Sequence, residues 1–398
     1  MTMKQRRTAD LSLFLTVTGL LLASLAFVYT ASASFSAAKM GASESMLFNH
    51  AKKVLVSFGV LLFMTKRDYH WYESRTQWIM GSALLLLVAV LFIGTRELGA
   101  RRWLPLGPIS FQPAEFAKFA LVLHVSAMCA KRQELMGDLR KGLMPILLWA
   151  FAAVVLIAKQ PNMSTASVLV LITFGILYIA QMPLKYIITA GGLAAVGGVI
   201  FALTATYRVQ RMLAFVGHHT SQTDKVTYQL DQALLAFGNG GLFGVGIGQS
   251  KQSMFFLPES YGDFIYSVIG EEYGFVGAAL LMVVFAFIVI RGIQIAKHAP
   301  DAFGRYVAFG ITMTIAIYAI VNSFVNVGLM PVTGLPMPFV SYGGTSMIFS
   351  AAAVGILLNI SKSIETLPKP PKITLSERLE RLMHRGGADE AGAETQTA

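Results

Sequence analysis

Residues 11–34, LSLFLTVTGLLLASLAFVYTASAS, form an apolar stretch without a single charged side chain. A helix crosses the hydrocarbon core of a bilayer, about 30 Å thick, in about 20 residues. This stretch is therefore long enough and apolar enough to span a membrane. The basic KQRR before it and the small residues at its end also resemble a secretory signal with a cleavage site. We expect an uncleaved first span, because similar apolar runs follow along the chain.

The composition extends this expectation to the whole chain. The 398 residues are 55% hydrophobic and only 13% charged, and the mean hydropathy is +0.61, whereas soluble domains carry about 25% charged residues. Apolar runs near the spanning length recur from end to end and leave little room for a soluble domain. We predict an all-α polytopic membrane protein of about ten transmembrane helices, placed near residues 11–34, 47–65, 77–95, 110–130, 142–158, 164–182, 185–204, 273–292, 304–327 and 339–360.

The basic residues predict the orientation of these spans. Lys and Arg gather in short clusters between the apolar runs, and more of them fall on the inner segments if the chain starts inside. Cytoplasmic loops are enriched in Lys and Arg, so both termini are predicted to be cytoplasmic. The net charge of +11 could also suit nucleic acid, but charges that act as topology signals do not require such a partner. The single cysteine, Cys129, excludes an internal disulfide.

The spans divide the chain into three parts. Residues 1–10 are expected to form a cytoplasmic amino terminus, and residues 11–361 the membrane domain. This domain includes one large extracytoplasmic loop, residues 205–272, between spans seven and eight. Loops of this length are usually functional or disordered, and the aromatic and glycine content of this loop favours order. The cytoplasmic tail, residues 362–398, is polar towards its end and is expected to be largely disordered.

One acidic and one basic residue stand out within an otherwise apolar span. The stretch RRWLPLGPISFQPAEFAKFA, residues 101–120, places Glu115 and Lys118 three residues apart, on one face of the fourth span. Because ionisable side chains are costly in lipid, these two must pair or face a polar cavity. They could form a structural ion pair that clamps helices, or line a site for an anionic head group, and both can hold together.

Two loops contain many turn-forming residues. KQPNMSTA, residues 159–166, separates two spans, and its composition suits either a simple turn or a functional site. The long loop contains glycines at 238, 240, 241, 244, 246 and 248. These match no nucleotide-binding motif. They favour either a backbone nest for phosphate or a loop packed closely against a helix.

The end of the long loop contains several acidic residues. Asp263 precedes the eighth span and could cap that helix or act in chemistry. Glu271 and Glu272 lie beside an apolar run and could be interfacial and solvated. His218 and His219 resemble a metal pair, but without a carboxylate at ligand spacing they fit ordinary loop residues better.

Residues 326–346, NVGLMPVTGLPMPFVSYGGTS, interrupt what could otherwise be continuous helix. Non-helical backbone at membrane depth is tolerated only where it is buried in protein or faces water. We expect this segment to line a cavity.

In this order, the motifs resemble those of the SEDS family, the FtsW, RodA and SpoVE group of cell-wall polymerases. The family's RWxxLG and QPxExxK patterns are matched by Arg102, Trp103, Gly107, Gln112, Pro113, Glu115 and Lys118. Its LPE, DF and EExGxxG patterns are matched by Leu257, Pro258, Glu259, Asp263, Phe264, Glu271, Glu272, Gly274 and Gly277. Its GLPxPFxSYGGxS signature is matched by residues 334–346. Asn162 and Ser164 depart from the usual QPDxGTA, and YGDF replaces HTDF. YTASAS, from Tyr29, is closer to the FtsW pattern than to RodA.

The resemblance implies a peptidoglycan glycosyltransferase that polymerises lipid II, by inverting transfer, at the outer face of the inner membrane, with division favoured over elongation. Such chemistry needs a base for the acceptor hydroxyl and cations for the departing pyrophosphate. Carried over by motif, Asp263 is the candidate base. The candidate substrate-binding residues are Arg102, Lys118, Arg208, Arg211 and Lys251 for the pyrophosphate, Glu115 to orient Lys118, and Gln112, Ser341, Tyr342, Gly343 and Gly344.

The resemblance also implies partners: lipid II, a class B penicillin-binding transpeptidase, other division proteins and membrane lipid. A divalent cation, Mg or Mn, could assist, but the sequence shows no ligand set for a metal. Two rival functions remain open. A lipid II transporter would use Glu115, Lys118 and the broken helix as a polar track. A non-catalytic division scaffold would need only the outer loop and the tail.

Overall fold

The computed structural model describes residues 9–97, 100–106, 109–204 and 225–364, together with positions 209 and 215. The chain divides after Ser363 into two units. The second unit lies almost entirely outside the described residues, so the description concerns the first.

The described residues contain ten long apolar helices, one for each predicted span. Nine helical segments are long and apolar enough to cross a membrane, and one of them, Leu139–Lys159, joins the π-helical turn η2 (Leu139–Leu143) to α6. The tenth, α7, is apolar but shorter, with 17 residues. The prediction of an all-α polytopic membrane protein is therefore confirmed. The helices are α1 (Leu11–Met40), α2 (Ser45–Lys66), α4 (Thr76–Ile93), α5 (Pro113–Lys131), α6 (Met144–Lys159), α7 (Met163–Ile179), α8 (Leu184–Leu203), α11 (Ile265–His298), α12 (Ala302–Asn326) and α13 (Gly344–Ser363).

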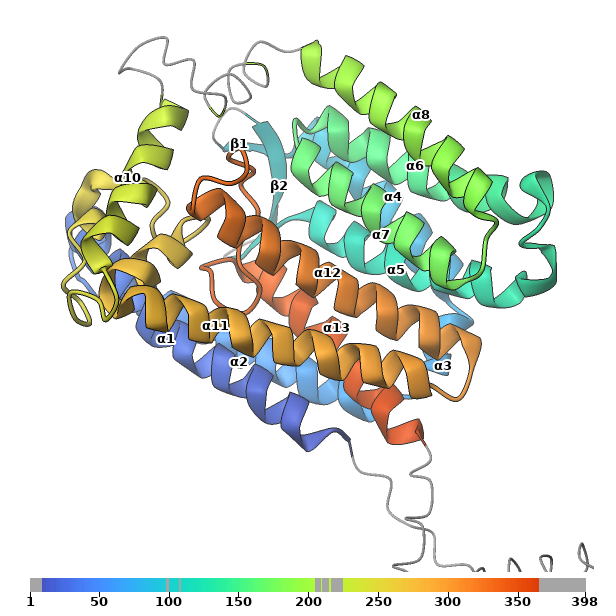
Figure 1. Cartoon of the computed structure of the whole chain (residues 1–398), viewed down its shortest axis with the longest axis horizontal. Helices are drawn as coiled ribbons and strands as arrows, with labels where there is room; N and C mark the ends of the chain where they lie inside the picture. The colour runs from blue at the N-terminus through green and yellow to red at the C-terminus, as the bar shows by residue number, and fades with distance from the viewer. Residues whose placement is uncertain are drawn as a thin grey trace, which may run out of the picture. The chain divides into compact units, whose positions relative to one another are not determined.

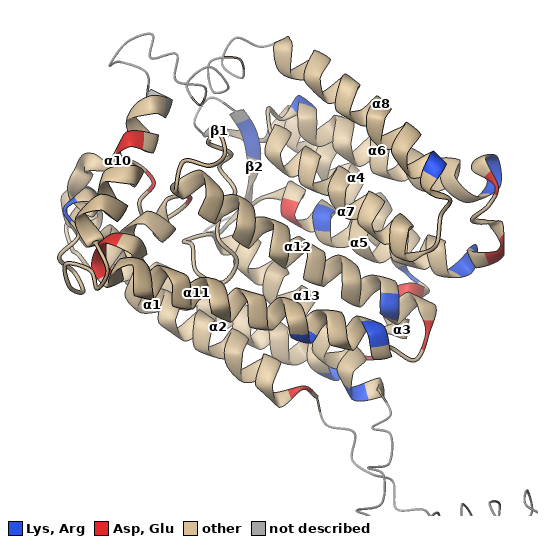
Figure 2. Cartoon of the chain, in the orientation of Figure 1, with Lys and Arg blue, Asp and Glu red and all other residues tan. Residues whose placement is uncertain are grey.

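The long helices run roughly along one direction, so that their connections gather at two opposite ends (Figure 1). One end carries α3 (His70–Glu73), and the other carries α10 (Lys225–Gly240) together with a small sheet. We call the second end the loop end. Figure 2 shows most of the Lys and Arg ribbon segments near the end that carries α3. The positive-inside rule therefore predicts that this end is cytoplasmic and that the loop end faces outward.

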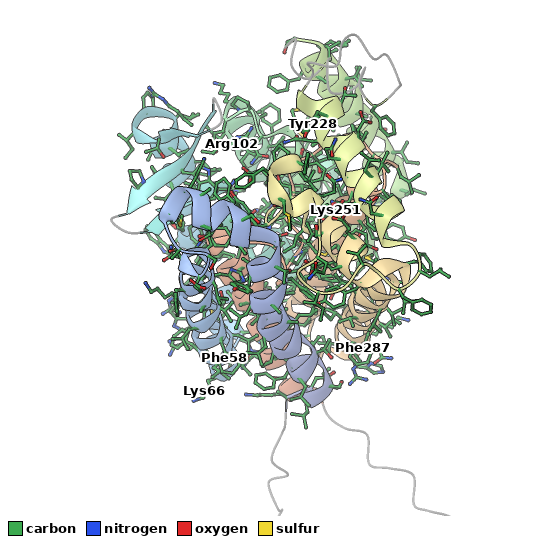
Figure 3. The ribbon with its side chains drawn as sticks, turned by 90° about the vertical axis from the view of Figure 1, so that its left-hand side faces the viewer. Phe58, Lys66, Arg102, Tyr228, Lys251 and Phe287 are labelled. Carbon is green, nitrogen blue, oxygen red and sulfur yellow. The ribbon has the colours of Figure 1, made fainter. Side chains whose placement is uncertain are left out.

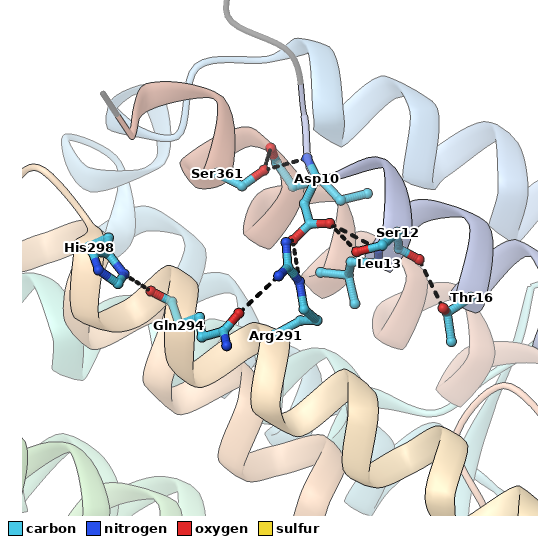
Figure 4. A network of polar contacts seen from close by, with 9 residues as sticks. Asp10, Ser12, Leu13, Thr16, Arg291, Gln294, His298 and Ser361 are labelled. Carbon is cyan, nitrogen blue, oxygen red and sulfur yellow. Dashed lines mark hydrogen bonds and ion pairs between the residues drawn. The ribbon is translucent and has the colours of Figure 1, made fainter. Parts of the chain in front are cut away.

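A polar network joins both chain ends of the membrane unit (Figure 4). The Asp10 amide donates to Ser361 Oγ at 3.0 Å, and the Asp10 carboxylate pairs with Arg291 of α11 at 2.6 Å. Partial burial raises the pKa of Asp10, but hydrogen bonds from Ser12, Leu13 and Arg291 and the Arg291 charge outweigh it, so the pKa is held below its usual value. The start of α1 and the end of α13 therefore lie at the same end of the bundle.

A three-stranded antiparallel sheet replaces the expected start of the fourth span. Its strands β1 (Thr95–Glu97), β2 (Ala100–Leu106) and β3 (Ile109–Phe111) are ordered β1-β2-β3. The span was expected to begin at 110, but α5 begins at Pro113. A proline fits the first turn of a helix because its missing N–H would be unpaired there anyway. Arg102 belongs to β2, and Figure 1 shows this strand at the loop end.

The predicted loop 205–272 also contains regular structure. It includes α10, the π-helical turn η3 (Gln252–Phe256) and the start of α11, which begins at Ile265 instead of 273. Helix α11 is interrupted at Gly274, whose φ of 69° and ψ of −169° are not helical. The predicted eighth span started at 273, next to this interruption, because the part of α11 before it contains two glutamates.

Candidate active site at the loop end

Asp263 lies in the turn between η3 and α11 and is partly exposed. Phe264, and not Asp263, occupies the N-cap position of α11, so the capping interpretation of Asp263 is wrong. A Cβ placed on Gly334 would lie 3.3 Å from Asp263 Oδ2. The Asp263 carboxylate therefore faces residues 326–346, the stretch at the end of α12 that contains the GLPxPFxSYGGxS signature. We call this stretch the signature segment.

Two asparagines of α12 hold the backbone of this turn. The Asp263 carbonyl accepts hydrogen bonds from Asn322 Nδ2 at 2.8 Å and from Asn326 Nδ2 at 3.0 Å. Asn326 Oδ1 also accepts from the backbone and side chain of Ser267. The sequence analysis did not identify these asparagines. Their spacing could have indicated such a role, because two asparagine side chains four residues apart lie on one face of an apolar helix, and polar groups in a span usually bond to another segment.

The signature segment is held in place by Asn322 and by the hydroxyl of its own Ser341. Asn322 Nδ2 donates to the Leu335 carbonyl at 2.8 Å, and Ser341 Oγ accepts from the Met337 amide at 2.8 Å. Leu335, Met337 and Ser341 are buried. Non-helical backbone at this depth is thus accommodated largely by burial in protein, whereas we expected it to line a cavity.

The turn QPNMS connects the signature segment to the sheet. Asn162 caps α7 by accepting from the Thr165 amide at 3.3 Å, and Ser164 Oγ donates to the Thr333 carbonyl at 2.8 Å. Arg102 Nε donates to the Gln160 carbonyl at 3.0 Å, and Arg102 Nη2 donates to the Pro161 carbonyl. Both departures from the family pattern therefore have a structural use, since Asn and Ser supply the cap and the link.

The predicted pair Glu115 and Lys118 is formed, and it is buried. Lys118 Nζ lies 2.7 Å from Glu115 Oε2, with relative side-chain exposures of 7% and 3%. The same Nζ lies 3.8 Å from the ring centroid of Tyr318 on α12. The pair therefore joins α5 to α12, as the structural interpretation expected. Lys118 also lines a small, mostly apolar pocket with Phe119, Ile311 and Phe349.

The other predicted substrate-binding residues occupy different surroundings. The backbone N–H of Gln112 donates to Thr345 Oγ1 at 3.2 Å, which links the start of α5 to α13. The Tyr342 amide donates to the Tyr261 carbonyl at 2.9 Å. Lys251 is exposed, and Figure 3 shows it on the α10 side of the loop end, with Arg102 on the strand side. Arg208, Arg211, His218 and His219 lie outside the described residues.

Glu271 and Glu272 are buried, so the interpretation of them as interfacial, solvated acids is wrong. Their relative exposures are 0% and 2%. Glu271 Oε2 accepts from Ser250 Oγ at 2.5 Å and from the backbone N–H of Gln252 at 3.1 Å, and Glu271 Oε1 accepts from Asn239 Nδ2 at 3.0 Å. Burial is possible because these bonds replace water around the carboxylate. The first glutamate thus ties the glycine-rich loop to α11.

The interruption of α11 at Gly274 explains the glycine content of this loop. The freed amides of Phe275 and Val276 donate to the Gly241 and Leu242 carbonyls, at 2.9 and 3.1 Å. The Glu271 carbonyl in turn accepts from the Val245 amide at 2.9 Å. The loop backbone therefore satisfies groups that a continuous helix would pair internally. This geometry agrees with the close-packed loop, which was one of the two interpretations of the glycines.

Gly244 offers a direct test of this packing. Its φ is +83°, and a Cβ there would overlap the backbone of Glu272. We expect Gly244→Ala to detach the loop from α11, since both the φ and the contact disfavour a side chain. Hydrogen exchange of residues 240–246 should rise at least tenfold, a change of about 1.4 kcal/mol in local opening free energy. Gly238→Ala is the matched control, because a Cβ there meets nothing within 4 Å. Equal exchange in both variants would contradict this packing role.

The described residues contain no group of three or more His, Cys, Asp or Glu side chains that could hold a metal ion. The Mg or Mn considered from the resemblance stays a prediction, because Mg²⁺ is usually held by only one or two carboxylates together with substrate phosphates.

Residues 11–366 match the family model FTSW_RODA_SPOVE, described as "Cell cycle protein". The chain belongs to this family. The part of the chain that matches the FtsW/RodA/SpoVE model thus covers all ten spans and the motifs that meet at the loop end. The recognition made from the motifs is confirmed.

Curated relatives of this FtsW/RodA/SpoVE protein are similar over nearly their whole length. Stage V sporulation protein E of Bacillus subtilis is 35% identical over 90% of this chain and 98% of its own. "Probable peptidoglycan glycosyltransferase FtsW" of Trichlorobacter lovleyi is 37% identical over 90% of this chain and 94% of its own. The FtsW relative of Geobacter sulfurreducens is 35% identical over 92% and 98%.

Solved structures show the same fold. A chain of a peptidoglycan synthase complex superimposes with a TM-score of 0.75, at 24% identity, over 90% of this chain and 99% of its own. The rod shape determining protein RodA of Thermus thermophilus gives a TM-score of 0.66 at 24% identity, over 90% of this chain and 98% of its own.

Proposed function

We propose that this protein is a peptidoglycan glycosyltransferase that polymerises lipid II into glycan strands at the outer face of the inner membrane. The observation that carries the proposal is the position of Asp263. Two asparagines of α12 hold its carbonyl, and its carboxylate faces Gly334 of the signature segment. Relatives that are 35–37% identical and named "Probable peptidoglycan glycosyltransferase FtsW" support the same activity.

Asp263 is suited to act as the general base. In the proposed step its carboxylate takes the proton from the acceptor sugar hydroxyl, and the hydroxyl oxygen then forms a bond to the anomeric carbon of the donor. The bond from that carbon to the prenyl diphosphate breaks at the same time, with inversion. Asp263 is partly exposed, which suits contact with a substrate. The hydrogen bonds to its backbone carbonyl fix the turn independently of the protonation of its side chain.

The biological role proposed is septal synthesis during division, supported by the FtsW names of relatives and by the YTASAS motif. A class B transpeptidase is the proposed partner, with other division proteins. The likeness to a chain of a complex that coordinates polymerization and crosslinking supports this pairing at the level of fold.

Reconstitution with lipid II distinguishes this function from lipid transport. The full-length protein, placed in vesicles with lipid II and its cognate transpeptidase, should convert the lipid into long glycan chains. A second measurement on the same vesicles follows the transfer of labelled lipid II between leaflets. Chain growth without accelerated transfer is the expected result. Accelerated transfer without chain growth would refute the proposed function and favour the transporter.

A further inference from the structure

Lys53 of α2 lies beside the signature segment, although no sequence motif singles it out. Its ammonium nitrogen is 3.6 Å from the ring centroid of Tyr342. A Cβ placed on Gly344 would lie 3.3 Å from Cδ and from Cε of Lys53. The lysine stem therefore passes closely over a glycine at the start of α13. Lys53 is half-buried, and this close packing of its stem restricts the position of its ammonium group.

Direct contacts connect Lys53 to the turn that contains the proposed base. The ring of Tyr342 meets that of Tyr261 edge to face, with centroids 5.7 Å apart and planes at 88°. The Tyr342 amide also donates to the Tyr261 carbonyl at 2.9 Å. Tyr261 precedes Asp263 by two residues. A positive charge, an aromatic pair and the candidate base thus belong to one continuous part of the loop end.

Lys53 has no protein counter-charge in the part of the chain that the structure describes. The ion pairs found there involve other residues, and no hydrogen bond from the Lys53 ammonium to a protein acceptor is present within that part. A cation–π contact with Tyr342 stabilises the charge but uses none of its three N–H donors. By contrast, Lys118 is neutralised by Glu115, and Arg102 donates to two backbone carbonyls.

We infer that Lys53, resting on the Tyr342 ring, binds the diphosphate group of a prenyl-linked sugar substrate. A half-buried ammonium with unused donors suits an oxygen-rich anion, because charge-assisted hydrogen bonds to phosphate are strong. A lipid-linked anion fits better than a free one, since Lys53 lies within a membrane-crossing helix. This inference rests on the proposed function for the substrate class. It adds a cation that the motifs did not supply.

Equilibrium binding to the full-length protein in lipid nanodiscs tests the inference without turnover. The probes are undecaprenyl diphosphate, undecaprenol and inorganic pyrophosphate. Lys53→Met should weaken binding of undecaprenyl diphosphate by about tenfold to a hundredfold, the usual cost of one lost charged hydrogen bond. Lys53→Arg should retain most of the affinity. Undecaprenol should bind equally to wild type and Lys53→Met, because it lacks the anion.

Lys52→Met is the matched control, since it removes the same charge from an exposed position one residue earlier. It should bind undecaprenyl diphosphate like wild type, and equal thermal midpoints establish that each variant is folded. Unchanged affinity in Lys53→Met, or an equal loss in Lys52→Met or with undecaprenol, would overturn the inference. Inorganic pyrophosphate binding as tightly as the lipid would overturn the lipid-linked assignment.

This binding test is separable from the proposed function. A wild-type protein that binds undecaprenyl diphosphate through Lys53, but never extends glycan chains, would refute the polymerase activity alone. A protein that polymerises lipid II, but binds undecaprenyl diphosphate equally well with and without Lys53, would refute the inference alone.

Discussion

Asp263→Asn should leave a folded protein whose polymerisation of lipid II falls by about 10²–10⁴-fold, the contribution typical of a general base. Asparagine has nearly the same shape as aspartate but cannot accept the proton of the acceptor hydroxyl. The bonds from Asn322 and Asn326 reach the backbone carbonyl of residue 263, so the substitution leaves them in place. The measurement is the rate of glycan chain growth by the purified variant with its cognate transpeptidase.

Asp231→Asn provides the control for this experiment. Asp231 is an exposed carboxylate on α10, at the same end of the molecule, and its substitution removes one negative charge without touching the turn at Asp263. Its chain growth should equal that of wild type. Wild-type rates in Asp263→Asn would show that the base is another group, even if the protein proves to be a polymerase.

The second large effect concerns the buried pair of Glu115 and Lys118. Lys118→Met or Glu115→Gln alone should destabilise the protein by about 3–5 kcal/mol, because each leaves an uncompensated charge in the interior. The double variant should lose much less, since it buries neither charge. Reversible unfolding in mixed detergent micelles measures all three, and a double-mutant cycle gives the coupling between the two side chains.

Lys131→Met is a suitable control for this cycle, because Lys131 is exposed in the last turn of the same helix. A Lys118→Met variant no less stable than Lys131→Met would contradict a structural role. Polymerisation by the double variant then separates the two interpretations of the pair. Retained chain growth means that the pair only clamps α5 to α12, whereas a folded but inactive double variant means that it also serves the substrate.

Much of the site could be predicted from the sequence only as a set of motifs. Asp263 and the signature segment were identified, and the structure brings them together at Gly334. Arg102 was expected to meet a pyrophosphate, yet its guanidinium donates to the carbonyls of Gln160 and Pro161. Asn322 was not identified, although its amide bridges the carbonyls of Asp263 and Leu335. A motif gives the type of side chain at a position but not the partner it meets.

The spans themselves were determined by the sequence. Each of α1, α2 and α12 coincides with an apolar run, because the free energy of placing a helix in lipid is a sum over neighbouring residues of one segment. The family was determined in the same local way, through short motifs in a fixed order. Such properties need no knowledge of how the helices pack.

The tertiary structure alone decided which polar groups meet. Glu271 and Glu272 look like solvated acids in the sequence, yet they are buried, and Glu271 binds a loop that begins about 30 residues earlier. Lys53 is separated from Tyr342 by most of the chain, and only the packing of α2 against α13 brings them together. Hydrogen bonds and charge contacts act over a few ångströms, so their partners are chosen by packing in space and not by position along the chain.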